Sequence, residues 1–344
     1  MHNERELIRA IQERAAQQGS GTGRLIKLAI GDDCALLRPP RGSELAITTD
    51  LTLEGVHFRL DWHPAESVGH RCLARGLSDL ASMGARPEAA FLSIALPREF
   101  GGRWFNGFLD GWMRLAQAHG VALAGGDTAE APRGRGGRRG IFVADIVLVG
   151  SVPVGKALRR AGARAGDILY VTGALGGAAA ELRALAMKPT VNRKRDAEKH
   201  PHLYPEPRLK VGARLMRSRL ATAAIDLSDG LSTDLTHICE ASNLYAMVEQ
   251  EALPIAPGAT LHEALHGGED YELLFTARPQ AKVPAKLSGV PVHAIGRMLT
   301  GAGRRRIPGS ADCRIELCAE DGRRAPLQAG GWEHFRKKGK RGSG

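Results

Sequence analysis

The pattern that decides the fold is clearest in ATAAIDLSDGLSTDLTHICEAS, residues 221–242 of a 344-residue chain. The apolar residues up to Ile225 predict a short buried strand, the residues at 226–230 predict an acidic turn, and the spacing of apolar residues from Leu231 onward predicts a helix. Short apolar runs that end in a Gly or hydroxyl residue followed by an acid recur along the chain. The sequence therefore predicts alternating strands and helices with acids at the turns between them.

The chain divides near Pro153 into two halves, and each half alternates strands and helices. We predict an N-terminal domain at 1–152, a C-terminal domain at 153–335 and a basic disordered tail at 336–344. Apolar runs predict strands at 25–33, 44–50, 89–97, 121–128, 141–152, 167–173, 271–277 and 290–296, and the 121–128 run ends in a turn. Helical spacing predicts helices at 3–17 with Asn3 as its cap, 67–85, 103–120 with Gly120 as its stop, 178–186 and 208–218.

Two basic segments separate these elements. Residues 132–140, PRGRGGRRG, predict a solvated hairpin loop, although a phosphate-attracting loop is an alternative interpretation. Residues 188–200 are polar and basic and predict an exposed loop.

Composition limits the class of protein. Hydrophobic residues make up 43% of the chain and charged residues 25%, which suits a globular protein with a sizeable core. The net charge of +11 would suit nucleic acid, but only 5% of residues are aromatic and no nucleic-acid motif is present, so we do not expect nucleic-acid binding. Five cysteines without a CxxC pair, a charged N-terminus and the lack of a long apolar run predict a soluble, cytoplasmic protein without membrane contact.

The most informative residues are acids at the ends of apolar segments. They are Asp33, Asp50, Asp79, Asp127, Asp226, Asp229 and Glu269. A single Asp beside Gly, Ser or Thr is commonly a turn residue or a helix N-cap, and that interpretation stays open for each of them. As a set, carboxylates and hydroxyls without His or Cys nearby suit Mg²⁺, which usually binds through a few carboxylates and substrate phosphates. The set predicts phosphate chemistry.

The two usual nucleotide motifs are not satisfied. Residues 150–157, GSVPVGKA, approach a P-loop, but Ala157 has no hydroxyl for a metal and Pro153 removes a backbone N–H. Residues 171–182 place glycines between a strand and a helix, but their spacing predicts a tight turn rather than a dinucleotide site. Three further residues have ordinary structural interpretations when taken singly, namely His57, Arg160 and Trp332.

Seven motifs occur in order along the chain: IGDDCALL (30–37), TTDLTLEGVHF (48–58), LSDLASMGA (77–85), GGDT (125–128), DLSDGLSTDL (226–235), GGEDYELLF (267–275) and GWEHF (331–335). As an ordered set they closely resemble the thiamine-monophosphate kinase family over nearly the whole length. The resemblance implies an α/β (α+β) fold of the two-domain aminoimidazole-ribonucleotide-synthetase (PurM-like) type, with mixed sheets packed with helices. It also implies a homodimer in which the N-terminal domains build a shared β-barrel.

The resemblance further implies transfer of the ATP γ-phosphoryl group to thiamine monophosphate, giving thiamine diphosphate, with several Mg²⁺ ions between the two substrates. The matching metal positions are Asp33, Thr48, Thr49, Asp50, Asp79, Asp127, Asp226 and Asp229, of which Asp50, Asp127 and Asp229 are the expected catalytic residues. The matching nucleotide positions are Gly126, Asp127, Arg160 and Ser228, and the matching substrate positions are His57, Glu269 and Trp332. The chain departs from the family at Gly76, where Asn is frequent, and at Trp332 and Glu333, where Tyr and Asp are frequent.

Phosphoryl transfer needs positioning and charge neutralisation more than covalent help. A phosphomonoester acceptor has a second pKa of roughly 6 and is mostly ionised at pH 7, so no strong general base is required. We therefore expect direct in-line transfer, with Arg160 on the ATP phosphates, Trp332 stacked on the acceptor ring and Glu269 near one of its rings. The alternatives left open are another ATP-using synthetase of the same superfamily and a non-enzymatic binder of nucleotide or thiamine phosphate.

Overall fold

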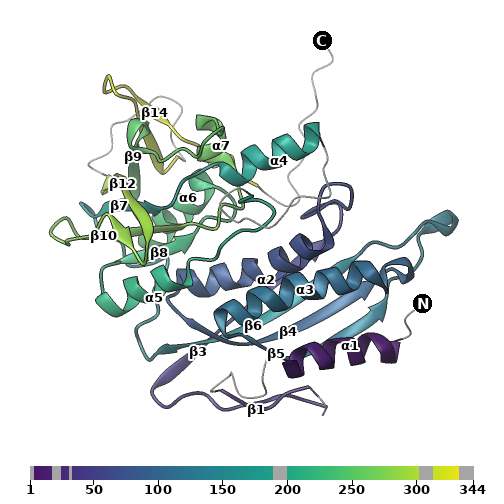
Figure 1. Ribbon diagram of the computed structural model, residues 1–344. Coiled ribbons are helices and arrows are strands. Elements are labelled where there is room, and N and C mark those ends of the chain that lie inside the picture. The colour runs from purple at the N-terminus through teal and green to yellow at the C-terminus, as the bar shows by residue number, and fades with distance from the viewer. Residues whose placement is uncertain (1–3, 18–24, 31–32, 189–199, 302–312, 333–344) are drawn as a thin grey trace.

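The computed structural model describes residues 4–17, 25–30, 33–188, 200–301 and 313–332. These residues form an eight-stranded sheet and a four-stranded sheet, each covered by helices, and a separate two-stranded sheet (Figure 1). The predicted cap Asn3, most of the predicted loop at 188–200 and the predicted disordered tail lie outside the described residues. In the described part of the chain, no helix is long and apolar enough to span a membrane.

The N-terminal half is built on a four-stranded sheet in the order β3-β6-β4-β5. Its strands are β3 (Ser43–Leu53), β4 (Arg86–Leu96), β5 (Ala122–Glu130) and β6 (Val143–Pro153). Helices α2 (Ala65–Ser82) and α3 (Arg103–His119) lie side by side across one face (Figure 1). Helix α1 (Glu4–Gln17) contacts β5, and the short pair β1 (Ile26–Leu28) and β2 (Leu36–Leu37) packs on the face opposite α2.

The helical spacing of the sequence places α2 and α3 on the sheet. In α3, Phe105, Phe108 and Trp112 are fully buried at intervals of three and four residues, and the helix ends at Gly120, whose φ of 66° is left-handed. The predicted stop at Gly120 is confirmed. The two helices approach closely at Gly111, where a Cβ would lie 1.9 Å from the carbonyl oxygen of Glu66. Only glycine permits this approach.

Two predictions about the first half are wrong. The 121–128 run does not end in a turn, because β5 continues through GGDT to Glu130 and pairs with β4 in parallel. The segment 132–140 is not a hairpin loop, because β4 lies between β5 and β6 in the sheet. Strand β4 is buried at almost every position, so it takes the interior place and separates two strands that are neighbours in sequence.

The arginines of the 132–140 segment bind acids of the same half of the molecule. Arg139 forms an ion pair with Glu54, and Arg133 lies 3.3 Å from Glu99. Two of the four arginines in this segment therefore form ion pairs with acids of the protein itself.

The C-terminal half contains an eight-stranded sheet in which β14-β13-β9-β12-β7-β10-β8 are neighbours and β11 pairs with β12. Its strands are β7 (Ile168–Thr172), β8 (Ala223–Asp226), β9 (Tyr245–Glu249), β10 (Leu273–Ala277), β11 (Lys286–Leu287), β12 (Val290–Leu299), β13 (Ile315–Cys318) and β14 (Arg324–Pro326). Its helices are α4 (Gly177–Met187), α5 (Leu209–Ser218), α6 (Leu231–Ser242) and α7 (Leu261–His266). The predicted strand, acidic turn and helix of 221–242 are confirmed as β8, the turn and α6.

The two halves share one apolar core. Leu209 and Leu215 of α5 and Phe275 of β10 belong to the same buried cluster as the apolar residues of α2 and α3. Helices α2 and α5 meet at Gly212, where a Cβ would lie 1.8 Å from the carbonyl oxygen of Ala81. Because α2 packs on both halves, its residues face the end of β8, and the Ser78 hydroxyl donates to Asp226 Oδ2 at 2.7 Å.

Candidate functional site

A cavity of about 310 Å³ lies where α2 and β3 of the first half face β8, α4 and the 268–271 segment of the second. Eight of the predicted site residues line it: Asp50, His57, Asp79, Asp226, Ser228, Asp229, Glu269 and Trp332. Thr48 adjoins it, because its hydroxyl donates to Asp79 Oδ2. Segments more than 200 residues apart in the sequence therefore meet in one place.

Three carboxyl groups of the cavity are buried close to one another. Burial and the neighbouring Asp79 raise the pKa of Asp50 to about 6 and that of Asp226 to about 7, although Arg75, 3.3 Å from Asp50, opposes the rise at Asp50. Burial also raises the pKa of Asp79 itself, although Thr48 and the positive charge of Arg160 oppose the rise. A hard cation would relieve this repulsion, and carboxylate and hydroxyl oxygens are the ligands that Mg²⁺ takes.

The turn after β8 is held by a residue that sequence reasoning missed. Asp234, which is 2% exposed in α6, accepts the backbone N–H groups of Asp229 and Gly230 at 3.1 and 3.0 Å. Burial, followed by the charges of Asp226 and Asp229, raises the pKa of Asp234 to about 8. The contact fixes the start of α6 and thereby the backbone of Asp229 at the cavity.

The remaining predicted site residues do not line this cavity. Asp33, Gly126 and Asp127 line a second cavity of about 670 Å³. Asp127 of β5 pairs with Ser93 of β4, and Ser93 pairs with Asp145 of β6. Paired residues of neighbouring strands lie on the same face of a sheet, so Asp127 lies on the face opposite the one that carries Asp50. Thr49 lies on that opposite face as well, since neighbouring strand residues alternate. Arg160 is exposed after β6 and does not line the cavity, although it is near enough for its charge to lower the pKa of Asp79. One copy of the chain does not bring all the predicted metal positions together.

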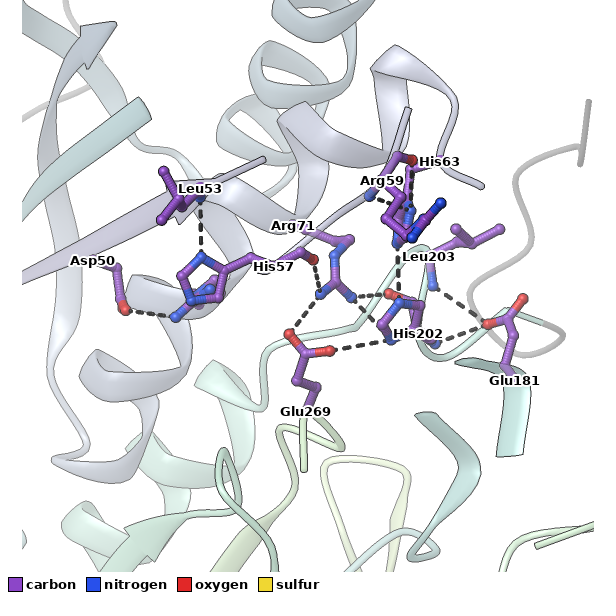
Figure 2. A network of polar contacts seen from close by, with 11 residues as sticks. Asp50, Leu53, His57, Arg59, His63, Arg71, Glu181, His202, Leu203 and Glu269 are labelled. Atoms are coloured by element: carbon purple, nitrogen blue, oxygen red, sulfur yellow. Dashed lines mark hydrogen bonds and ion pairs between the residues drawn. The ribbon is translucent and has the colours of Figure 1, made fainter. Parts of the chain in front are cut away.

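Figure 2 shows a network of polar contacts along the cavity wall that includes Asp50, His57 and Glu269. Arg71, whose side chain is 3% exposed, donates from Nη2 to Glu269 Oε1 at 2.6 Å, and His202 Nδ1 lies 3.2 Å from Glu269 Oε2. Burial raises the pKa of Glu269, but the charge of Arg71 and the contact with His202 outweigh it and hold that pKa well below its usual range. Glu269 is therefore an anion at the cavity wall.

The backbone around Glu269 is strained and is held by hydrogen bonds. Glu269 and Tyr271 have φ values of 67° and 49°, which non-glycine residues rarely adopt. The N–H of Glu269 donates to Ser228 O at 2.8 Å, and the N–H of Tyr271 donates to Leu227 O at 2.9 Å. The GGEDY segment and the turn after β8 are thus one rigid unit.

Two buried histidines extend the network behind Glu269. His63 Nε2 lies 3.0 Å from His202 Nε2, and the N–H of Arg59 donates to His63 Nδ1 at 3.2 Å. His63 therefore carries its proton on Nε2 and donates it to His202, whose own Nδ1–H points to Glu269. Burial, followed by the positive charge of Arg71, lowers the pKa of His63 to about 3, and burial also lowers the pKa of His202. Both rings are neutral in the folded protein.

The neutral state of His63 predicts a pH-dependent loss of stability. Its folded pKa of about 3 lies below the ordinary 6.5, so the unfolded chain takes up the proton first as the pH falls. Between pH 7 and pH 5 this should lower the free energy of unfolding by about 2 kcal/mol. We expect His63→Gln to remove this part of the slope in urea unfolding, measured at both pH values. Equal pH dependence in the two proteins would contradict the assignment.

Arg75 is a cavity residue that the sequence analysis did not select. It follows Arg71 and precedes Asp79 by four residues each on α2, so all three share a helix face. This spacing was visible in the sequence. By contrast, the neighbouring departure at Gly76 faces the sheet, since a Cβ there would lie 2.7 Å from Leu148 Cδ1 and 2.9 Å from Ile146 Cδ1. An Asn at this position would meet packed side chains rather than the cavity.

The other departure from the family pattern lies at the cavity rim. The side chain of Trp332 is 55% exposed, and its backbone N–H donates to Asp229 O at 3.1 Å. An exposed indole beside a cavity can stack on a ligand ring. Glu333 lies outside the described residues.

Comparisons with known proteins agree on one family. The AIR synthase related protein models match twice, the N-terminal domain at residues 31–152 and the C-terminal domain at 164–307. The thiamine-monophosphate kinase of Salmonella typhimurium is 39% identical over 90% of this chain and 92% of its own length. The crystal structure of thiamine-monophosphate kinase from Stenotrophomonas maltophilia K279a aligns with a TM-score of 0.77 at 35% identity, covering 92% of this chain and 97% of that one. AaThiL complexed with AMPPCP and TMP aligns with a TM-score of 0.70 at 27% identity, covering 97% and 99%.

Proposed function

The chain belongs to the thiamine-monophosphate kinase family, and we propose that it transfers the γ-phosphoryl group of ATP to thiamine monophosphate to form thiamine diphosphate. The observation that carries the proposal is the lining of the 310 Å³ cavity. It combines carboxyl groups suited to metal-bound phosphates with Glu269, His57 and an exposed indole, which suit an organic cation. The likeness to AaThiL complexed with AMPPCP and TMP supports the same assignment.

The clustered acids fit Mg²⁺, because their oxygens are hard ligands and because burial and mutual repulsion raise the pKa values of Asp50 and Asp226. Asp50, Asp79, Asp226 and Asp229, with Thr48 adjoining, would hold the ions. When bound, Mg²⁺ supplies neutralisation of the phosphate charges that ATP and the acceptor bring together. Asp33, Thr49 and Asp127 complete the proposed metal set.

The chain's own residues position the two substrates. Ser228, Gly126, Asp127 and Arg160 are the proposed nucleotide contacts, and the exposed Arg160 guanidinium can neutralise phosphate oxygens. The acceptor lies with its rings toward Glu269, His57 and Trp332 and its phosphate toward the acids. Asp50, Asp127 and Asp229 are the proposed catalytic residues. The acceptor phosphate attacks directly, because an ionised phosphomonoester needs no strong base.

The proposed assembly is a homodimer formed through the N-terminal halves, with the domain boundary near Pro153. In the described residues the four-stranded sheet is open, with β3 at one edge, and Leu45, Ile47 and Leu51 of β3 are 39%, 62% and 55% exposed. An apolar edge strand favours pairing with another chain. Closure of two such sheets into a shared barrel would cover these residues and the face that carries Asp127 and Thr49.

The first experiment follows thiamine diphosphate directly after mixing purified protein with ATP, Mg²⁺ and thiamine monophosphate. Free thiamine and the Asp50→Asn variant run beside it. We expect product from the monophosphate only, and none from the variant, since Asp50 lies in the acidic cluster. No product from the unaltered protein at saturating ATP and Mg²⁺ would overturn the kinase assignment.

A further inference from the structure

Arg75 carries a buried hydrogen-bond donor that no atom of the described residues satisfies. Its Nη2 lies 3.3 Å from Asp50 Oδ1, but its Nη1 is buried and has no partner among the described residues. The side chain is 17% exposed and lines the cavity. An unpaired N–H on a buried guanidinium is unfavourable unless a ligand supplies an acceptor. Arg75 therefore differs from Arg71, which donates to Glu269, His57 O and His202 O.

The position of Arg75 along α2 indicates which kind of ligand it meets. Arg71, Arg75 and Asp79 follow at four-residue intervals, so Arg75 lies about 6 Å along the helix axis from each neighbour. Arg71 holds the proposed ring-binding carboxylate Glu269, and Asp79 belongs to the acidic cluster. A molecule that spans the cavity from Glu269 to the acids passes Arg75 with its middle, where an acceptor with a phosphate tail begins its anionic part.

We propose that Arg75 is a phosphate-binding residue of this cavity, whose guanidinium turns its Nη1 toward the phosphate of the acceptor when that ligand enters the cavity. The inference rests on the proposed function and names a positioning contact that the family resemblance does not supply. A guanidinium presents several donors in one plane, so it can serve a carboxylate and a phosphate together. The phosphate of the acceptor is then held on one side by the metal ions that the acids bind and on the other side by Arg75.

A structural role and a phosphate-binding role predict different measurements. If Arg75 only neutralised Asp50, its loss would lower stability and leave Asp50 freer to bind a metal ion, without discriminating among organic ligands. If it binds the acceptor phosphate, its loss should remove the preference for a phosphorylated ligand. Thiamine monophosphate and thiamine differ only in that phosphate, and AMPPCP reports on the donor phosphates.

Isothermal titration with Mg²⁺ present would measure binding of thiamine monophosphate, thiamine and AMPPCP to the unaltered protein, Arg75→Met, Arg75→Lys and the exposed control Arg114→Met. Arg75→Met keeps most of the apolar stem, and thermal unfolding checks that each variant is folded. We expect Arg75→Met to weaken thiamine monophosphate about 10- to 100-fold and the other two ligands less than threefold. Arg75→Lys should fall between, and Arg114→Met should match the unaltered protein.

Several outcomes would overturn the proposal. They are unchanged affinity of Arg75→Met for thiamine monophosphate, an equal loss for thiamine, a loss confined to AMPPCP, and no preference for the monophosphate in the unaltered protein. Formation of thiamine diphosphate is measured separately. If the unaltered protein forms product but Arg75→Met binds thiamine monophosphate as tightly as the unaltered protein does, only this inference fails. If Arg75→Met loses affinity for the phosphorylated ligand but the unaltered protein forms no product, only the kinase assignment fails.

Discussion

Asp226→Asn should abolish phosphoryl transfer and at the same time stabilise the metal-free protein at pH 8. Asp226 is 3% exposed, and burial together with Asp79 raises its pKa to about 7. Above that pH the folded protein holds a buried, repelled charge. An amide keeps the volume and an acceptor for the Ser78 hydroxyl, but removes the charge. The same charge is what a metal ion requires, so activity and metal-free stability should move in opposite directions.

The sign of the pH effect follows from the raised pKa. The stabilising effect of protonated Asp226 is complete below the ordinary pKa of 3.8 and is lost as the pH rises through about 7. The advantage of the Asn variant should therefore be on the order of a few kcal/mol at pH 8 without Mg²⁺ and should vanish near pH 4. Mg²⁺ should stabilise the unaltered protein more at pH 8 than at pH 6, since it binds the ionised carboxylates.

Urea unfolding with and without Mg²⁺, and the thiamine diphosphate assay, measure both effects. We expect the activity of Asp226→Asn to fall about 100-fold or more. Asp61→Asn is the matched control, because Asp61 is exposed and forms a surface ion pair with Arg59. An Asp226→Asn protein that keeps a tenth of the activity, or that is less stable than the parent at pH 8 without metal, would refute the role assigned to Asp226.

The sequence predicted well what depends on local pattern. The spacing of Phe105, Phe108 and Trp112 predicts α3, and Gly120 ends it, because helix periodicity and the left-handed cap are properties of neighbouring residues. Most of the selected acids also meet at the cavity, although Asp50 lies within β3 and Asp79 within α2 rather than at the end of a strand. Element order and the candidate acids follow from such local rules.

Features that depend on partners distant in sequence were not predictable. The hairpin at 132–140 failed because β4, an interior strand, separates β5 from β6. Arg71 and Glu269 are 198 residues apart, and nothing local in either segment indicates the ion pair. The separation of Asp127 from Asp50 depends on the alternation of strand faces combined with a sheet order that the sequence does not state.

Glu269→Gln should weaken both the fold and the acceptor site. The substitution leaves an acceptor for Arg71 but removes the negative charge from a guanidinium that is 3% exposed. Loss of one partner of a buried ion pair destabilises a protein on the order of 3 kcal/mol. We expect the KM for thiamine monophosphate to rise more than about tenfold, with a smaller change in kcat, because Glu269 lines the cavity and is proposed to contact the acceptor rings rather than the transferred group. A KM increase of less than twofold would count against the substrate role.

His202 and His63 can adjust to the Glu269→Gln substitution, so the variant tests the loss of the negative charge rather than a change of side-chain geometry. The new amide N–H₂ would face His202 Nδ1, which accepts a hydrogen bond if the ring moves its proton to Nε2. His63 can follow by placing its proton on Nδ1, which lies 3.1 Å from Arg59 O. The geometry of Figure 2 is then retained, and the loss reports the missing charge.

A pH series separates the two contributions to this loss. The folded pKa of Glu269 is depressed, so its stabilising charge is fully present above the ordinary value of 4.5 and is lost as the pH falls below it. The stability difference between Glu269→Gln and the parent should therefore be constant near neutral pH and shrink in acid. Glu251→Gln, at an exposed position, should show no difference in either range. A gap that persists unchanged well below pH 4 would mean that the amide disturbs packing, and the ion pair with Arg71 would then not be the source of the effect.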